Sequence, residues 1–210
     1  MKVLITGGNG FIGSHLADKL IDAGEDVTLF DLGFGKNTEH LDSKKIVGDI
    51  RNIEDISNAV KDKDFIFHLA AVSRVVLGQN DPENCIKTNI MGALNLLEAL
   101  RKMNNNGMVL FGSSREVYGE QQTIPVRENS PKKPISVYGV TKLTAEEFFS
   151  SHFKNYGIKS VIFRFSNVYG TERDLLDRVI PKFILRALKN KPITLYGGNQ
   201  VLDFTHIDDT

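Results

Sequence analysis

A glycine-rich turn near the start of the chain constrains its fold more than any other feature. The apolar run Val3–Ile5 leads into the sequence TGGNGFIG, which has glycines at positions 7, 10 and 13. The next segment, Phe11–Ala23, repeats its apolar residues with the period of a helix. In such a turn Gly7 permits the sharp change of direction, Gly10 lets the backbone approach a pyrophosphate, and Gly13 lets the helix pack closely. The pattern therefore predicts a strand, a phosphate-binding turn and a helix.

An acidic residue after the second apolar run limits which dinucleotide the glycine turn can bind. The run Asp26–Phe30 is typical of a strand, and Asp31 follows it directly. A carboxylate at this place can accept a hydrogen bond from a ribose 2′-hydroxyl and repels a 2′-phosphate. We therefore expect NAD rather than NADP, bound by Gly7, Gly10, Phe11, Ile12, Gly13 and Asp31. The alternative is a glycine turn that binds nothing, with Asp31 as a solvated strand end.

The rest of the chain alternates short apolar runs with segments of helical period, which predicts βαβ units and a parallel sheet. Further strands are expected at 46–47, 65–67, 108–111 and 160–165, and helices at 86–100 and 137–156. After Asn167 the rhythm changes to a helix at 175–188, with Pro181 near its start or at a kink, and a strand at 193–196. The predicted fold is a doubly wound α/β Rossmann domain over residues 1–168, followed at 169–210 by the start of a small substrate-binding domain.

Composition limits the classes of partner. The formal net charge is zero, which gives no electrostatic case for nucleic-acid or membrane-surface binding. No apolar stretch approaches the roughly 20 residues that cross a bilayer, and the first residues do not resemble a secretory signal. The single cysteine, Cys85, allows no internal disulfide, and the five histidines lack metal-ligand spacing. We therefore expect a cytoplasmic protein without a metal.

The last residues, Asp208-Asp209-Thr210, are of the type that starts a helix, yet no helix follows them. We therefore expect the polypeptide to be part of a longer protein; a frayed natural terminus is the alternative.

A tyrosine and a lysine in the predicted helix at 137–156 are candidates for catalysis. Tyr138 and Lys142 are four residues apart, so they share one face of the helix. A free tyrosine has a pKa of about 10 and is a poor base at neutral pH, but a fixed positive charge favours its phenolate. Tyr138 could then remove a proton from a hydroxyl while a hydride leaves the same carbon. Alone this spacing is common on exposed helices; the glycine turn and the Ser113-Ser114 pair at a strand end favour the catalytic interpretation.

Seven motifs occur in one order along the chain, and together they resemble the extended short-chain dehydrogenase/reductase family, in its NAD-dependent epimerase/dehydratase branch. They are the glycine turn, Gly48-Asp49-Ile50, His68-Leu69-Ala70-Ala71, the segment Ser113–Gly119, Tyr138-x-x-x-Lys142, the segment Arg164–Gly170 and the segment Asp203–Asp209. Members of this family are usually longer than this chain.

The resemblance implies roles for individual residues. Ser114 would hydrogen-bond the reacting sugar hydroxyl, Tyr138 would be the base, and Lys142 would tune it. Asn167 would meet the substrate diphosphate. The cofactor would contact Asp49, Ile50, Leu69, Ala70, Ala71, Asn89, Tyr138, Lys142, Phe165 and Ser166.

Structural roles remain open for several of these residues. Asp49 could instead cap the next helix, the Leu69–Ala71 run could be strand core, and Ser114 could be a turn residue. Asn89 could bond backbone groups only, and Asn167 could satisfy loop carbonyls.

Two positions depart from the pattern of the family. Glu116 is typical of relatives that dehydrate or decarboxylate the sugar, but its neighbour is Arg115, where the dehydratases usually have an acid. Glu116 could instead pair with Arg115. Leu202 stands where many relatives have an arginine that contacts the substrate diphosphate. Either another cation takes that task, such as Arg173 or one in the region that this chain lacks, or the substrate is not an ordinary nucleotide sugar.

The resemblance therefore implies an NAD-dependent nucleotide-sugar epimerase that inverts carbon 4 of a UDP-hexose through a 4-keto intermediate. A 4,6-dehydratase or decarboxylase that uses Glu116 is the alternative enzyme, and a non-catalytic NAD sensor is the alternative outside catalysis. Relatives are often homodimers, which predicts an interface formed by the helices at 89–100 and 137–156.

Overall fold

The computed structural model describes residues 1–210, and a six-stranded parallel sheet forms its centre. Its spatial order is β3-β2-β1-β4-β5-β6, which is the order of doubly wound dinucleotide-binding folds. The predicted Rossmann fold is therefore confirmed. The order reverses between β1 and β4, and a ligand crevice is expected outside the carboxyl ends of these strands. The strands are β1 Lys2–Thr6, β2 Asp26–Asp31, β3 Lys44–Val47, β4 Phe65–His68, β5 Met108–Ser114 and β6 Ser160–Phe165.

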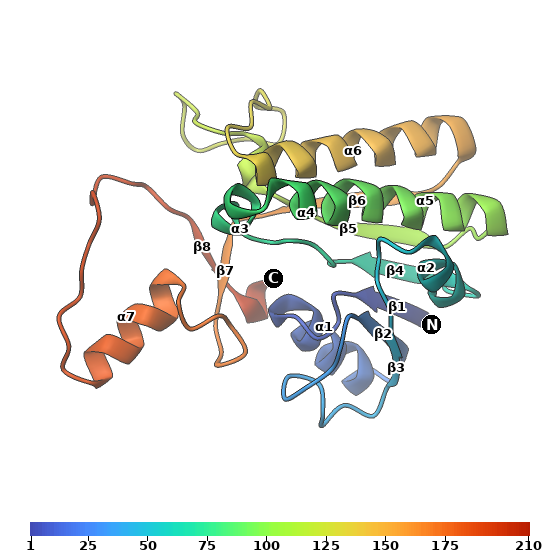
Figure 1. Ribbon diagram of the computed structural model, residues 1–210, viewed down its shortest axis with the longest axis horizontal. Helices are drawn as coiled ribbons and strands as arrows, with labels where there is room; N and C mark the ends of the chain where they lie inside the picture. The colour runs from blue at the N-terminus through green and yellow to red at the C-terminus, as the bar shows by residue number, and fades with distance from the viewer.

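Helices cover both faces of the sheet. On one face, α2 (Ile53–Val60), α5 (Gly92–Met103) and α6 (Val137–Tyr156) pack on a large apolar core. On the other face, α1 (Phe11–Asp22) packs on a smaller core that includes Val3 and Ile5. Figure 1 shows α5 and α6 side by side above the sheet and α1 below it. Because both faces are covered, β1 is apolar throughout Val3–Ile5 rather than alternating.

The helix predicted at 86–100 is the middle of a longer helical run. This run consists of α4 (Pro82–Ile86), one π-helical turn (Lys87–Met91) and α5. Asp81 caps its start by accepting from the backbone N–H of Asn84, and left-handed Asn104 ends it. A shorter helix, α3 (Val75–Asn80), precedes it.

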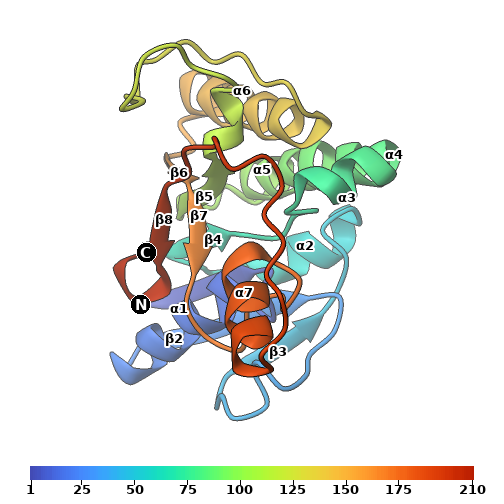
Figure 2. The same cartoon turned by 90° about the vertical axis from the view of Figure 1, so that its left-hand side faces the viewer.

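The chain after β6 lies at the carboxyl edge of the large sheet. It forms β7 (Asn167–Tyr169), α7 (Val179–Leu188) and β8 (Phe204–His206), and β7 pairs with β8 in parallel. Figure 2 shows α7 in front of this edge. The helix predicted from 175 begins only at Val179, which places Pro181 in its first turn, where a missing N–H costs little.

The strand predicted at 193–196 is absent, and this prediction was wrong. Residues 191–195 have no regular structure, and the side chains of Ile193, Leu195 and Tyr196 are exposed. No strand lies beside them to accept their backbone hydrogen bonds, so apolar character alone did not make a strand.

None of the helices combines the length and the apolar character that crossing a membrane requires.

Candidate active site

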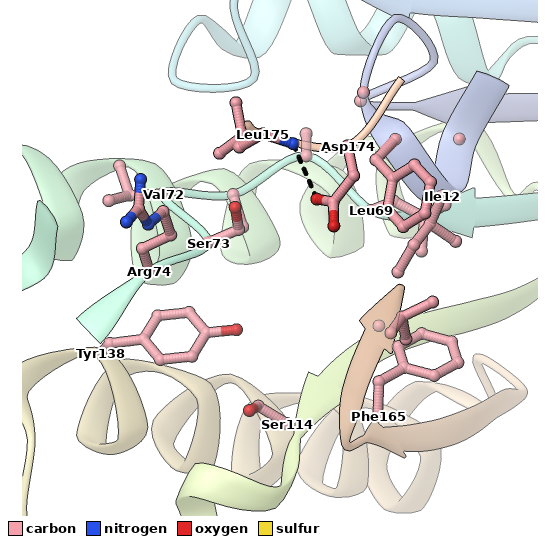
Figure 3. Close-up of a pocket in the computed structure, with 18 of the residues that line it drawn as sticks. Ile12, Leu69, Val72, Ser73, Arg74, Ser114, Tyr138, Phe165, Asp174 and Leu175 are labelled. Carbon is pink, nitrogen blue, oxygen red and sulfur yellow. Dashed lines mark hydrogen bonds between the residues drawn. The ribbon is translucent and has the colours of Figure 1, made fainter. Parts of the chain in front are cut away.

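A cleft of about 1010 Å³ opens at the carboxyl ends of β1, β4, β5 and β6, where the strand order reverses. Figure 3 shows side chains from several separate segments of the chain facing this space. Every residue predicted to bind cofactor or substrate, or to act in catalysis, lines the cleft, except Asn89. Their contacts with a ligand stay predictions, but the fold brings together residues that are far apart in the sequence.

The glycine turn has a shape that only glycine allows. Gly7 has φ +72°, and a Cβ on it would lie 2.7 Å from the backbone nitrogen of Ala70. A Cβ on Gly13 would lie 2.3 Å from the carbonyl oxygen of Gly7, so Gly13 lets the start of α1 close onto the turn. At Gly10 a Cβ would meet only the Gly7 oxygen, at 3.1 Å, and otherwise point into open space. No side chain caps the start of α1, so its N–H groups remain available to a pyrophosphate.

Asp31 lies at the end of β2, and its carboxylate has hydrogen-bond acceptor positions that are not used within the chain. One carboxylate oxygen accepts from the backbone N–H of Asn9 at 2.9 Å and the other from that of Leu32 at 2.8 Å. Burial raises the pKa of Asp31, and these two hydrogen bonds act against that rise. A carboxylate has about four acceptor positions, so two remain for ribose hydroxyls. The turn and Asp31 together fit a dinucleotide with a free 2′-hydroxyl.

Asp49 and Ile50 form the wall beyond β3. Arg51 donates to both carboxylate oxygens of Asp49, at 2.6 to 3.0 Å, and this pairing lowers the pKa of Asp49. Asp49 does not cap the next helix, because Asn52 does so by accepting from the N–H of Glu54. Ile50 is buried in the large core.

The predicted catalytic groups are brought together at the opposite wall. Tyr138 and Lys142 start α6, and Ser114 ends β5; all three are buried. Figure 3 shows the hydroxyl groups of Tyr138 and Ser114 pointing into the same space. Ser136 fixes this end of the helix, since its hydroxyl accepts from the N–H of Gly139 at 3.0 Å. The spacing therefore predicted the shared face of Tyr138 and Lys142 correctly.

Burial opposes the charged forms of both Tyr138 and Lys142 at this wall. Burial raises the pKa of Tyr138 to about 12, and the Ser114 hydroxyl acts in the opposite direction. The Lys142 ammonium donates to the carbonyl oxygen of Gly112 at 2.7 Å and lies 6.0 Å from the centre of the Tyr138 ring. Burial lowers the pKa of Lys142 to about 8. With only the groups of the chain present, the cleft keeps Tyr138 neutral, and a further positive charge beside it is needed to form the base.

The lowered pKa of Lys142 predicts a pH dependence of stability. The unfolded chain keeps the ordinary value of 10.5, so between pH 8 and 10.5 it binds more protons than the folded chain. Stability from this group therefore rises with pH in that window, by at most about 1.4 kcal/mol per pH unit. Urea unfolding from about pH 8 to about pH 9.5 should give a smaller rise in Lys142→Met than in the wild type. Equal slopes in the two proteins would contradict the buried-lysine assignment.

Glu116 lines the cleft next to Ser114, but it is paired. The guanidinium of Arg115 lies 3.2 Å from its carboxylate, as the alternative interpretation expected. Directly after β6, the neighbour of β5 in the sheet, the hydroxyl of Ser166 and the amide of Asn167 both donate to the carbonyl oxygen of Asp203, each at 2.9 Å. Asn167 thus satisfies a loop carbonyl, and its side-chain oxygen is left for a ligand.

Asn89 lies behind the wall of the cleft, which does not support its predicted contact with the cofactor. It is buried in the π-helical turn, and its amide bonds both backbone groups of Val72 and the hydroxyl of Thr141, at 2.8 to 3.1 Å. Its polar atoms are therefore used to hold the segment after β4 against α6.

Arg173, one cation that could compensate for Leu202, is already paired. Leu202 does not line the cleft, and Arg173 lines it but donates to Asp18 at 2.5 Å. Sequence reasoning missed two arginines of the cleft, Arg74 and Arg178. Both lie in connecting segments, where no periodicity or motif could have indicated them.

Sequence reasoning also missed a buried ion pair behind the wall that carries Ser114 and Tyr138. Glu146 of α6 accepts from the Arg164 guanidinium at 2.9 and 2.8 Å and from the Ser113 hydroxyl at 2.6 Å. Burial opposes its charge, but these bonds hold the pKa of Glu146 below its ordinary value. Arg164 also donates to the hydroxyl of Tyr118 at 2.6 Å. The pair ties α6, β5 and β6 together next to Ser114.

Comparisons with known proteins agree with this fold. The model of the NAD dependent epimerase/dehydratase family matches residues 3–210. A putative UDP-glucose 4-epimerase of Methanocaldococcus jannaschii is 37% identical, over 99% of this chain and 70% of that protein. The solved UDP-glucuronic acid 4-epimerase of Bacillus cereus, in complex with UDP-glucuronic acid and NAD, has a TM-score of 0.89 and 35% identity, over 99% of this chain and 70% of that one. A UDP-glucuronic acid decarboxylase of Arabidopsis thaliana is 33% identical, over 100% of this chain and 50% of that protein.

Proposed function

The chain belongs to the NAD-dependent epimerase/dehydratase family, and from this premise we propose that it is an NAD-dependent nucleotide-sugar 4-epimerase acting on a UDP-hexose. The observation that carries the proposal is the placement of Ser114, Tyr138 and Lys142 at one wall of the cleft whose other wall is the glycine turn. The relatives described as UDP-sugar 4-epimerases support the choice of reaction.

The residues of the chain have separate tasks in this reaction. Bound NAD supplies reversible acceptance of a hydride from carbon 4 of the sugar. Tyr138, as phenolate, takes the proton of the 4-hydroxyl, and Ser114 holds that hydroxyl by a hydrogen bond. Lys142 keeps its positive charge near Gly112 and Tyr138, which favours the phenolate together with the charge of the oxidised cofactor. The net change would be inversion at carbon 4, so the product would be an epimer of unchanged mass.

Other parts of the predicted site belong to the same proposal. The glycine turn, Asp31 and the residues after β3 and β4 would bind NAD, and Asn167 would bind the substrate. The NAD-binding domain would end at about residue 168, where the substrate-binding region would begin. A homodimer through α5 and α6 is supported by exposed apolar side chains in this region, those of Met91, Val140 and Phe153. The cytoplasmic location stays a prediction.

A dehydratase or decarboxylase is the second candidate, because Glu116 lines the cleft beside Ser114. Its pairing with Arg115 at 3.2 Å favours the epimerase, since a paired carboxylate is a weaker base. A sensor that only binds NAD is disfavoured, because it has no need of a tyrosine, a serine and a lysine buried together.

The test is product analysis after incubation of the chain and NAD with UDP-glucose, UDP-N-acetylglucosamine and UDP-glucuronic acid. We expect NMR to show inversion at carbon 4 and mass spectrometry to show unchanged mass for one of them. Loss of water or carbon dioxide would instead support the enzyme that uses Glu116. Tight NAD binding without any conversion would favour the sensor.

A further inference from the structure

The segment 171–178, which we call the strap, is held at one end by hydrogen bonds to α1, the helix that follows the glycine turn. The hydroxyl of Thr171 forms a hydrogen bond of 2.7 Å with Nε2 of His15. Two residues later, the guanidinium of Arg173 donates to the carboxylate of Asp18 at 2.5 Å. His15 and Asp18 belong to α1, so this end of the strap is held at the wall that carries the phosphate-binding turn.

The other end of the strap is fastened to a different wall. Asp177 accepts from the guanidinium of Arg74 at 2.8 Å, and Arg74 is the residue directly before α3. The strap therefore runs from α1 to the segment after β4, and its middle residues line the cleft between them.

Asp174, in the middle of the strap, is buried with one carboxylate oxygen unpartnered. The residue is 4% exposed, and its Oδ1 accepts from the backbone N–H of Leu175 at 2.8 Å and from Arg178 at 3.0 Å. Its Oδ2 has no hydrogen-bond partner. Figure 3 shows this carboxylate entering the cleft from the side opposite Tyr138 and Ser114.

The chemistry of this oxygen defines the group that would satisfy it. Buried polar atoms in folded proteins are nearly always hydrogen-bonded, so an exception at a ligand cleft indicates a missing partner. A carboxylate oxygen only accepts hydrogen bonds, and its charge repels the phosphate oxygens of a nucleotide. We propose that Asp174 is a specificity-determining residue that accepts a hydrogen bond from a hydroxyl group of a sugar ring bound in the cleft.

Three kinds of ring could supply this hydroxyl: a ribose of the cofactor, the ribose of the UDP group and the hexose of the substrate. The inference rests on the proposed function, because that function brings all of them into the cleft. Calorimetric titration of the same variants with NAD, UDP-glucose and UDP separately distinguishes the three sources.

The test compares Asp174→Asn with the wild type by titration with NAD, UDP-glucose and UDP. Asparagine keeps an acceptor for Leu175 but replaces the acceptor Oδ2 by a donor. Loss of a charge-assisted hydrogen bond weakens binding about tenfold to a hundredfold. Weakening for NAD alone assigns a ribose of the cofactor. Weakening for UDP-glucose and UDP alike assigns the ribose of the UDP group, and weakening for UDP-glucose but not for UDP assigns the hexose. Affinities within about twofold of the wild type for all three ligands would overturn the proposal.

Asp177→Asn is the matched control, because it changes a carboxylate of the same strap that is already paired with Arg74. We expect it to change the affinities by less than about threefold. Equal weakening by both variants would assign the effect to the position of the strap and overturn the role of Asp174 as acceptor. If Asp174→Asn does not fold, Asp174→Ser is titrated under the same criteria. A wild type that binds neither NAD nor UDP-glucose would reject the proposed function and this inference with it.

Discussion

Replacing Tyr138 by phenylalanine is expected to lower the turnover number for sugar epimerisation by roughly 10²- to 10⁴-fold, the usual contribution of a positioned acid–base group. The change removes only the hydroxyl, which points into the same space as that of Ser114 at this wall of the cleft. The ring stays buried at the start of α6, so the fold and the glycine turn at the opposite wall are unaffected. NAD affinity should therefore change little while conversion is nearly lost.

Turnover is measured by NMR of the sugar products, and NAD affinity by titration of the same preparation. Tyr156→Phe is the control, since it makes the same chemical change at the exposed far end of α6 and should leave turnover within about twofold. A Tyr138→Phe protein that keeps full turnover would exclude Tyr138 as the base. One that loses NAD as well would show that the hydroxyl acts in binding and not only in proton transfer.

The doubly wound parallel sheet was predictable because local signals agreed with the global fold. Gly7, Gly10 and Gly13 occupy positions that the turn requires, and the apolar β1 indicates a strand covered on both faces. The small sheet was not predictable. The pairing of Asn167 with Phe204 joins strands that are far apart in the sequence, and short strands carry little periodicity.

The wall that carries Ser114, Tyr138 and Lys142 was predictable for a related reason. Tyr138 and Lys142 lie on one helix, so their spacing alone determines that they share a face. Asp174 and Arg74 gave no such signal, because their places in the cleft depend on contacts between distant segments. The same holds for Asn89, whose position within the helical run was predicted but whose amide is used by Val72 and Thr141.

The second large effect is expected from the ion pair that holds the catalytic wall. Replacing Glu146 by alanine should lower the free energy of unfolding by about 3–5 kcal/mol, because it leaves a largely buried guanidinium without its counter-charge. The Glu146 side chain is 2% exposed and that of Arg164 is 20% exposed, so water can replace little of the lost interaction. Urea unfolding measures the change. Ser114 follows Ser113 directly, so the remaining folded protein should also lose turnover.

Glu147→Ala provides a matched control one position along the same helix. The Glu147 side chain is 67% exposed and lies 3.4 Å from Lys132, so its loss should cost no more than about 1 kcal/mol. Replacing both partners, as in Glu146→Met with Arg164→Met, should destabilise less than Glu146→Ala alone, because no uncompensated charge remains. Equal costs for Glu146→Ala and Glu147→Ala would mean that the buried pair does not stabilise this wall. A double variant less stable than Glu146→Ala would mean that the hydrogen bonds of Arg164 to Tyr118 and to the backbone of Glu128, rather than its charge balance, hold β5 and β6 in place.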